Sequence, residues 1–166
     1  MFVVKDSMVL IHLSKLTLLE SSCELFERAV IPELVFKETV SEGKEEGYED
    51  AVLIEEIVEK DLIEVKEVRD RELIERANDF NIQSGEAEAV ALYWQEGADY
   101  MATDDDNVRK KQDILDLDLI STPSIILKLL EEGKIDEEKF RYSLDILRDI
   151  GWFSNTVIDK VLQMGV

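Results

Sequence analysis

The sequence predicts an α/β fold of three layers, in which helices cover both faces of a parallel β-sheet. The first observation is that short β-type runs alternate with longer helical patterns, as in consecutive βαβ units. The second is that the predicted strands are almost entirely apolar, which is typical of strands buried on both faces. The 166 residues contain no repeat or linker. We therefore expect one domain over residues 1–166.

The first half of the chain supplies three predicted strands and three helices. Apolar runs predict strands at residues 2–5, 29–31 and 62–65. The helix between the first two strands carries one apolar stripe, formed by Val9, Leu10, Leu13 and Leu16. Pro32 is expected to open a second helix that runs through Glu38, and residues 51–59 form an amphipathic third.

The second half adds two strands, at residues 100–102 and 117–120. Ser84 is a predicted N-cap for a helix that runs through Trp94. Thr122 is the predicted N-cap of the next helix, with Pro123 at its first position, and Gly133 ends this helix. Two more helices are predicted at residues 136–149 and 155–164, so residues 134–166 should form a helical C-terminal extension that packs back on the sheet.

The charge of the chain restricts the classes of partner. There are 39 acidic and 19 basic residues, which gives a net charge of -20. Such a chain repels nucleic acids and acidic lipids at long range, so a nonspecific nucleic-acid coat protein is excluded. An enzyme that acts on phosphates is not excluded, because bound divalent cations invert the field locally.

Several features predict a cytoplasmic protein without a membrane span. The longest apolar run, at residues 89–94, is far shorter than the ~20 residues that a spanning helix needs. The apolar N-terminus meets Lys5 too early for a signal peptide. Cys23 is the single cysteine, so no internal disulfide can form.

Aspartates follow two predicted strands, where α/β proteins gather their reactive groups. Asp6 follows the first strand, and Asp104, Asp105 and Asp106 follow the fourth. Asp6 also suits the role of a helix cap, and this alternative stays open. Capping uses at most one of the three later aspartates. Their mutual repulsion therefore favours a bound cation.

Two glutamates on helices are further candidates. Glu38 lies about two turns into its helix, and Glu86 lies in the first turn of the helix that begins at Ser84. Glu88 is ~200° further around that helix, so Glu86 and Glu88 cannot both point into one site. We favour Glu86, which lies nearer the start of the helix, and keep Glu88 as the alternative.

These acids and their surroundings resemble the PIN domain nuclease family over most of the chain. Residues 4–13 (VKDSMVLIHL) and 31–40 (IPELVFKETV) are similar to its first two motifs. Residues 84–92 (SGEAEAVAL), 98–105 (ADYMATDD) and 151–154 (GWFS) resemble a prokaryotic subgroup that has a Gly-Glu-Ala-Glu-Ala helix and a paired Asp. The resemblance implies a five-stranded parallel sheet in the order 3-2-1-4-5.

The resemblance also implies hydrolysis of RNA phosphodiester bonds with Mg²⁺ or Mn²⁺ as cofactor. It assigns the catalytic and metal-binding roles to five acids: Asp6, Glu38, Glu86, Asp104 and Asp105. Asp6 and Asp104 are expected to be the central ligands. The residues expected to orient these ligands are Ser7, Thr103 and Asp106.

The one basic triplet has two interpretations. Arg109, Lys110 and Lys111 either contact the RNA backbone or form a helix face that offsets Asp113 and Asp116. His12 has no His or Cys nearby in sequence, so no metal role is assigned to it. Trp94 and Trp152 are predicted to be core or interface residues rather than platforms for base stacking.

The expected partners follow from the family. We expect RNA as substrate and a homodimer, for which the apolar tail residues are Trp152, Phe153, Val157 and Val161. The biological role is open between the toxin of a toxin–antitoxin pair, which would bind an antitoxin protein, and RNA processing or decay. The alternative function is a catalytically silent PIN-like module for protein association.

Overall fold

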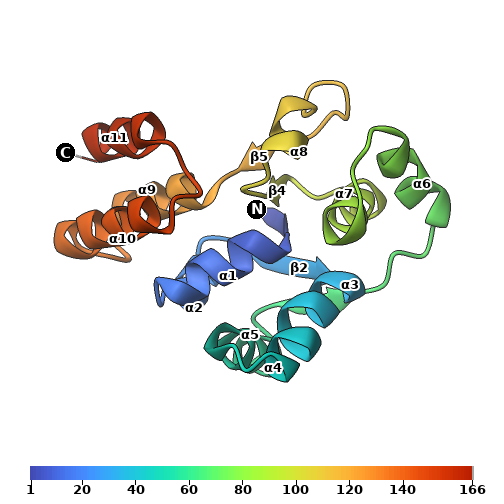
Figure 1. The fold of residues 1–166 in the computed structure, drawn as a ribbon, viewed down its shortest axis with the longest axis horizontal. Helices are drawn as coiled ribbons and strands as arrows, with labels where there is room; N and C mark the ends of the chain where they lie inside the picture. Colours follow the sequence, from blue (N-terminus) through green and yellow to red (C-terminus); the bar gives the residue numbers. More distant parts are fainter. Residues whose placement is uncertain (166) are drawn as a thin grey trace.

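A computed structural model describes residues 1–165 and contains a five-stranded sheet (Figure 1). Its strands are β1 (Phe2–Lys5), β2 (Arg28–Pro32), β3 (Glu64–Lys66), β4 (Tyr100–Ala102) and β5 (Leu119–Ile120). All four pairings are parallel, and the strand order is β3-β2-β1-β4-β5. The three-layer α/β/α architecture and the order 3-2-1-4-5 are therefore confirmed.

Helices fill the connections between the strands. The first half contains α1 (Ser7–Lys15), α2 (Leu19–Cys23), α3 (Glu33–Phe36), the π-helical turn η1 (Lys37–Ser41), α4 (Glu42–Glu45) and α5 (Glu49–Glu59). The second half contains α6 (Arg71–Asp79), α7 (Ser84–Glu96), α8 (Asp106–Lys110), α9 (Thr122–Glu131), α10 (Glu137–Ile150) and α11 (Asn155–Met164). None of the helices within residues 1–165 is long and apolar enough to cross a membrane.

Several predicted boundaries are wrong by a few residues. The third strand begins at Glu64 rather than residue 62, and the fifth is confined to Leu119–Ile120. The N-caps of α7 and α9 are Gln83 and Ser121, each one residue before the predicted cap. Helices α2, α6 and α8 were not predicted. Two of these have only five residues, too few to show a helical period.

The two faces of the sheet carry separate apolar clusters. Val3 points into a cluster that includes residues of α1, α2, α5, α9, α10 and α11. Its neighbour Val4 points to the opposite face, which α6 and α7 cover. Adjacent residues of a strand face opposite sides, so an almost continuous apolar strand is needed to fill both clusters. Figure 1 shows α6 and α7 on one side of the molecule and α9 to α11 on the other.

The C-terminal helices contribute to the first of these clusters. Phe140, Leu144 and Leu147 of α10 and Ile158 of α11 are fully buried there. Val161 is only 8% exposed. The expectation that Val161 offers surface for a dimer is therefore wrong, because its side chain packs inward. Trp152 and Val157 are exposed, at 49% and 37%.

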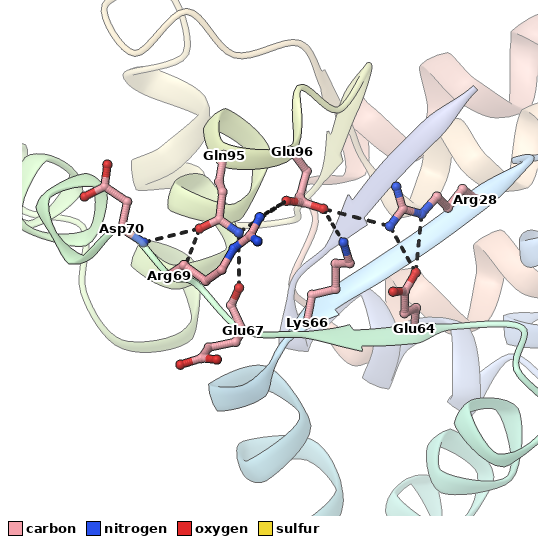
Figure 2. Close-up of polar contacts among 8 residues, drawn as sticks. All are labelled: Arg28, Glu64, Lys66, Glu67, Arg69, Asp70, Gln95 and Glu96. Carbon is pink, nitrogen blue, oxygen red and sulfur yellow. Dashed lines mark hydrogen bonds and ion pairs between the residues drawn. The ribbon is translucent and has the colours of Figure 1, made fainter.

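A polar network holds the C-terminal end of α7 against β3 (Figure 2). The Glu96 side chain is 8% exposed, and its Oε1 accepts a hydrogen bond of 2.5 Å from Lys66 Nζ. Arg28 and Arg69 lie 3.9 and 3.7 Å from the same carboxylate. The Gln95 amide accepts from the Arg69 backbone N–H and donates to the Glu67 carbonyl. The network fixes α7 at the end opposite the one that carries Glu86.

Replacing Glu96 by Gln should lower the free energy of unfolding by about 1–2 kcal/mol at pH 7, because Lys66 loses its counter-ion. The hydrogen bond from Lys66 holds the pKa of Glu96 below its usual value of 4.5. The loss of stability is therefore complete above pH ~4.5, and it shrinks as the pH falls through the lowered pKa of Glu96. Denaturation at several pH values measures it, with the exposed Glu46→Gln as control. Equal stability of both variants at pH 7 would contradict the prediction.

Candidate active site

Asp6 lies where β1 ends and α1 begins, on the central strand of the sheet. Its backbone is extended, with φ −88° and ψ 176°, and its Oδ1 accepts a hydrogen bond of 3.1 Å from Val9 N. The neighbouring strand β4 brings Thr103 alongside, and the Thr103 hydroxyl donates to Asp6 Oδ2. Asp6 therefore caps α1 with one oxygen and faces β4 with the other.

The carboxylate of Asp6 is in an environment that disfavours its charge. The side chain is 1% exposed, and burial raises its pKa from 3.8 to about 8. The hydrogen bonds from Thr103 and Val9 oppose this shift, whereas Asp104 and Glu86 add to it. No Lys, Arg or His among residues 1–165 forms an ion pair with Asp6. An ionised Asp6 thus lacks a compensating positive charge from the chain.

Glu38 reaches the same edge from η1. Its Oε2 accepts a hydrogen bond of 2.9 Å from Ser7 Oγ, and its Oε1 accepts one of 3.1 Å from Gly85 N. These contacts join the first turn of α1, η1 and the first turn of α7. A π-helical turn inside a helix is often found at functional sites. Here it carries the glutamate that the sequence analysis selected.

Gly85 permits the close approach of Glu38 to α7. A Cβ atom at this position would lie 2.6 Å from Glu38 Oε2 and 3.2 Å from both Cδ and Oε1. A heavy atom cannot occupy that space unless the carboxylate moves. The glycine of the Gly-Glu-Ala-Glu-Ala segment therefore allows Glu38 to keep its position, because any side chain here would displace the carboxylate.

The change Gly85→Ala should displace Glu38 and lower the activity of this site about tenfold or more, since misplacing one group by ~1 Å can cost 10²-fold. Gly43→Ala is the matched control, because its added methyl group would lie 2.9 Å from Ala51 Cβ, between α4 and α5. This control should lower stability but leave the activity per folded molecule unchanged. Equal activity per folded molecule of the two variants would show that the activity does not depend on the position of Glu38.

Glu86 is the half-buried acid of the first turn of α7. Burial raises its pKa, and the charges of Asp105 and Glu38 add to the rise. Glu86 and Asp105 also line one small pocket of about 270 Å³. The pKa of Glu88 is raised by burial as well, but the nearby Arg71 lowers it. Of the two glutamates, Glu86 is the one that faces Asp105.

Asp105 lies two residues beyond Thr103 and caps α8. Its Oδ1 accepts a hydrogen bond of 2.8 Å from Val108 N, and its backbone N–H donates to Thr103 Oγ1 over 3.1 Å. Thr103 therefore contacts both Asp6 and Asp105, and holds the ends of β1 and β4 in a fixed relation.

Asp104 makes different contacts from Asp105. Its side chain is 0% exposed, and both of its oxygens accept hydrogen bonds. Oδ1 accepts from Thr122 N at 2.7 Å, while Oδ2 accepts from Thr122 Oγ1 at 2.5 Å and lies 2.7 Å from His12 Nδ1. The Asp104 carbonyl accepts from the indole N–H of Trp152 at 3.0 Å. These contacts anchor Asp104 to α1, α9 and the tail, and suit a residue that positions Asp105.

His12 is the residue of this region that the sequence analysis missed. Its side chain is 1% exposed, and the rings of Trp152 and Phe153 lie 5.8 and 5.6 Å from its own. Among the described residues, His12 Nε2 has no hydrogen-bond partner. Asp104 is 92 residues away in sequence, so no local pattern could reveal the pair.

Asp106 and the basic triplet lie outside the group of acids. Asp106 is exposed and pairs with Arg109 and Lys110, and the hydrogen bond from Lys110 is the main cause of its lowered pKa. The Lys111 ammonium donates to the Phe80 carbonyl. Arg109 and Lys110 thus pair with Asp106 rather than with Asp113 or Asp116, and the contact of the triplet with RNA stays a prediction. Asp106 does not contact the acids that it was expected to orient.

The acids at this edge offer only hard oxygen donors, which suit Mg²⁺ or Mn²⁺. Asp6, Glu38, Glu86 and Asp105 are linked by mutual repulsion, which a cation would relieve. Within residues 1–165, no three such side chains are close enough to hold an ion as they are placed. The donor chemistry fits a divalent ion, and binding requires the side chains to move together.

The fold and the acids at the carboxyl edge of its sheet define a class of protein. It is an α/β domain with carboxylates gathered at the ends of its central strands. A family model described as a PIN domain matches residues 2–165. The chain therefore belongs to the PIN domain family, a family of nucleases that generally depend on metal ions and act on nucleic acids. Searches of curated proteins and of solved structures give no match.

Proposed function

We propose that this protein is a Mg²⁺- or Mn²⁺-dependent endoribonuclease. The observation that carries the proposal is that Asp6, Glu38, Glu86 and Asp105, from four separate segments of the chain, gather at the carboxyl edge of the sheet. Each acid is at least half-buried or hydrogen-bonded into place, although the group as a whole repels itself. Such an arrangement costs stability unless a cation offsets it.

The four acids are the proposed ligands, and their neighbours fix them. Ser7 holds Glu38, and Thr103 holds Asp6 and Asp105. Asp104 was expected to be a central ligand, but its three hydrogen bonds favour the positioning of Asp105. When bound, a divalent cation lowers the pKa of a water that attacks phosphorus and stabilises the leaving oxygen. The carboxylates of the chain would hold the cation and orient that water.

Products of RNA digestion test the proposal. The protein incubated with single-stranded RNA and Mn²⁺ should give internal cuts with linear phosphate ends, because water is the attacking group. Attack by the ribose 2′-hydroxyl would instead leave 2′,3′-cyclic phosphates. EDTA should stop the reaction. Intact RNA, or cyclic ends that also form in EDTA, would overturn the proposal.

The biological role is a further proposal. A ribonuclease of this kind serves either as the toxin of a toxin–antitoxin pair, held by an antitoxin protein, or in RNA processing. A cytoplasmic location and a homodimer fit both. The alternative, a silent association module, requires no divalent ion at the acids. Metal binding and RNA cleavage therefore separate the two functions.

A further inference from the structure

A groove of about 550 Å³ lies between the segment after β4 and the α10–α11 connection. Its size is within the range of about 300–1,000 Å³ that small-molecule sites occupy. The wall on the β4 side is polar and mainly acidic, with Asp105 and Asn107, and it also contains Arg109, which is paired with Asp106. The opposite wall is formed by the tail and includes Trp152, Phe153 and Val157. One side of the groove is therefore charged and the other is aromatic.

The groove is continuous with the proposed active site. Asp105 lines the groove and also lines the smaller pocket that contains Glu86. Thr103, which contacts Asp6 and Asp105, lines the groove as well. A ligand group that occupies the groove is thus adjacent to the phosphate that the acids would act on.

Trp152 presents a fixed aromatic surface in this groove. The side chain is 49% exposed, although its indole N–H is bonded to the Asp104 carbonyl and its ring contacts His12 edge-on. A half-exposed Trp that is held on one side loses little freedom when a second planar group stacks on it. This exposure shows that Trp152 is not a core residue, and its alternative place in a dimer interface stays a prediction.

We propose that the groove holds one nucleobase of single-stranded RNA, stacked on Trp152, next to the bond that is cut. This inference rests on the proposed function. A nucleobase is uncharged, so the acids of the groove do not repel it as they repel a phosphate. Asn107, Ser121 and Ser154 lie around it and can bond to base edges, while Trp152 supplies stacking for any base.

The kinetics of Trp152 variants test whether a base stacks on this side chain. Trp152→Leu should raise KM for a short single-stranded RNA about 5- to 150-fold, the range expected for the loss of one stacked base. Trp152→Phe keeps a stacking ring but lacks the N–H, so it should retain most of the affinity. Any fall in kcat for this variant reports the lost bond to Asp104. Tyr142→Leu is the control, because Tyr142 is 60% exposed on α10 and outside the groove.

An RNA with one abasic ribose beside the cut should show the same rise in KM with the parent protein. With Trp152→Leu the abasic change should have no further effect, because the stacking partner is already absent. Effects of the two changes that multiply, or an unchanged KM for Trp152→Leu, would overturn the inference. The second outcome would mean that no base stacks on Trp152.

A binding measurement separates this inference from the proposed function. In a Trp94→Phe variant, Trp152 is the only tryptophan, and a stacked base should quench its emission. A short single-stranded RNA added with Ca²⁺ is the probe. Quenching without any cleavage in Mn²⁺ would support the base site and overturn the nuclease proposal. Cleavage without quenching would overturn the base site alone.

Discussion

Replacing Asp6 or Asp105 by Asn is expected to reduce RNA cleavage by about 10²-fold or more, the largest effect that we expect from any single change. Each substitution removes a charged oxygen donor but keeps the shape of the side chain. Loss of residues that merely orient metal ligands typically costs 10–100-fold, so loss of a ligand should cost at least as much. Initial rates with a labelled RNA in Mn²⁺ measure the effect.

Two further variants define what this result means. Glu46→Gln changes an exposed acid in another part of the fold and should cleave at the rate of the parent protein. Asp104→Asn should lower stability by about 1–3 kcal/mol, because an amide cannot accept all the hydrogen bonds from His12 and Thr122. Undiminished cleavage by Asp6→Asn or Asp105→Asn would exclude these acids from the chemistry.

The same acids should make stability depend on pH and metal. The folded pKa of Asp6, about 8, is above its usual 3.8, so folding favours its protonated form. This stabilisation is complete below pH ~4 and is lost as the pH rises through about 8. Asp6→Asn avoids that loss. Without metal at pH 8 it should be more stable than the parent protein by on the order of 2 kcal/mol, or about 4–8 °C in melting temperature.

Mn²⁺ should remove most or all of this difference in stability between the two proteins. An ion present at about 100 times its Kd stabilises the parent protein by ~2.7 kcal/mol, whereas Asp6→Asn should respond weakly. Thermal melts of both proteins at pH 5 and pH 8, with Mn²⁺ and with EDTA, measure the effects of pH, of the ion and of the substitution on stability. A parent protein that melts at the same temperature at pH 8 with Mn²⁺ and with EDTA would contradict the proposed metal site.

Much of the fold could be predicted because four of the five strands are short, mostly apolar runs between helical patterns. Strand β3 has one apolar residue, and its start was misplaced. Asp6 follows such a run by one residue, so its place at the edge follows from the sequence alone. The assignment of Asp104 and Asp105 could not be made in this way. The two are adjacent and have the same side chain, and only the path of the backbone after β4 turns one toward His12 and Thr122 and the other toward Glu86.

Contacts between segments that are distant in the chain could not be predicted from the sequence either. His12 meets Asp104 across 92 residues, and Trp152 meets the Asp104 carbonyl across 48. Lys5 is a further case, because a lysine at the end of a strand is expected to reach solvent. Its side chain is fully buried, its Nζ donates to Ser22 Oγ over 2.9 Å, and burial lowers its pKa. Each of these depends on which helices cover the edge of the sheet.

A calorimetric titration with Mn²⁺ tests the central claim most directly, because it asks whether the gathered acids hold a divalent ion at all. The parent protein and Glu46→Gln should bind Mn²⁺ with equal affinity, and Asp6→Asn and Asp105→Asn should bind it at least about tenfold more weakly. No heat of binding with the parent protein, or equal affinity in all four proteins, would contradict the account and favour a module for protein association.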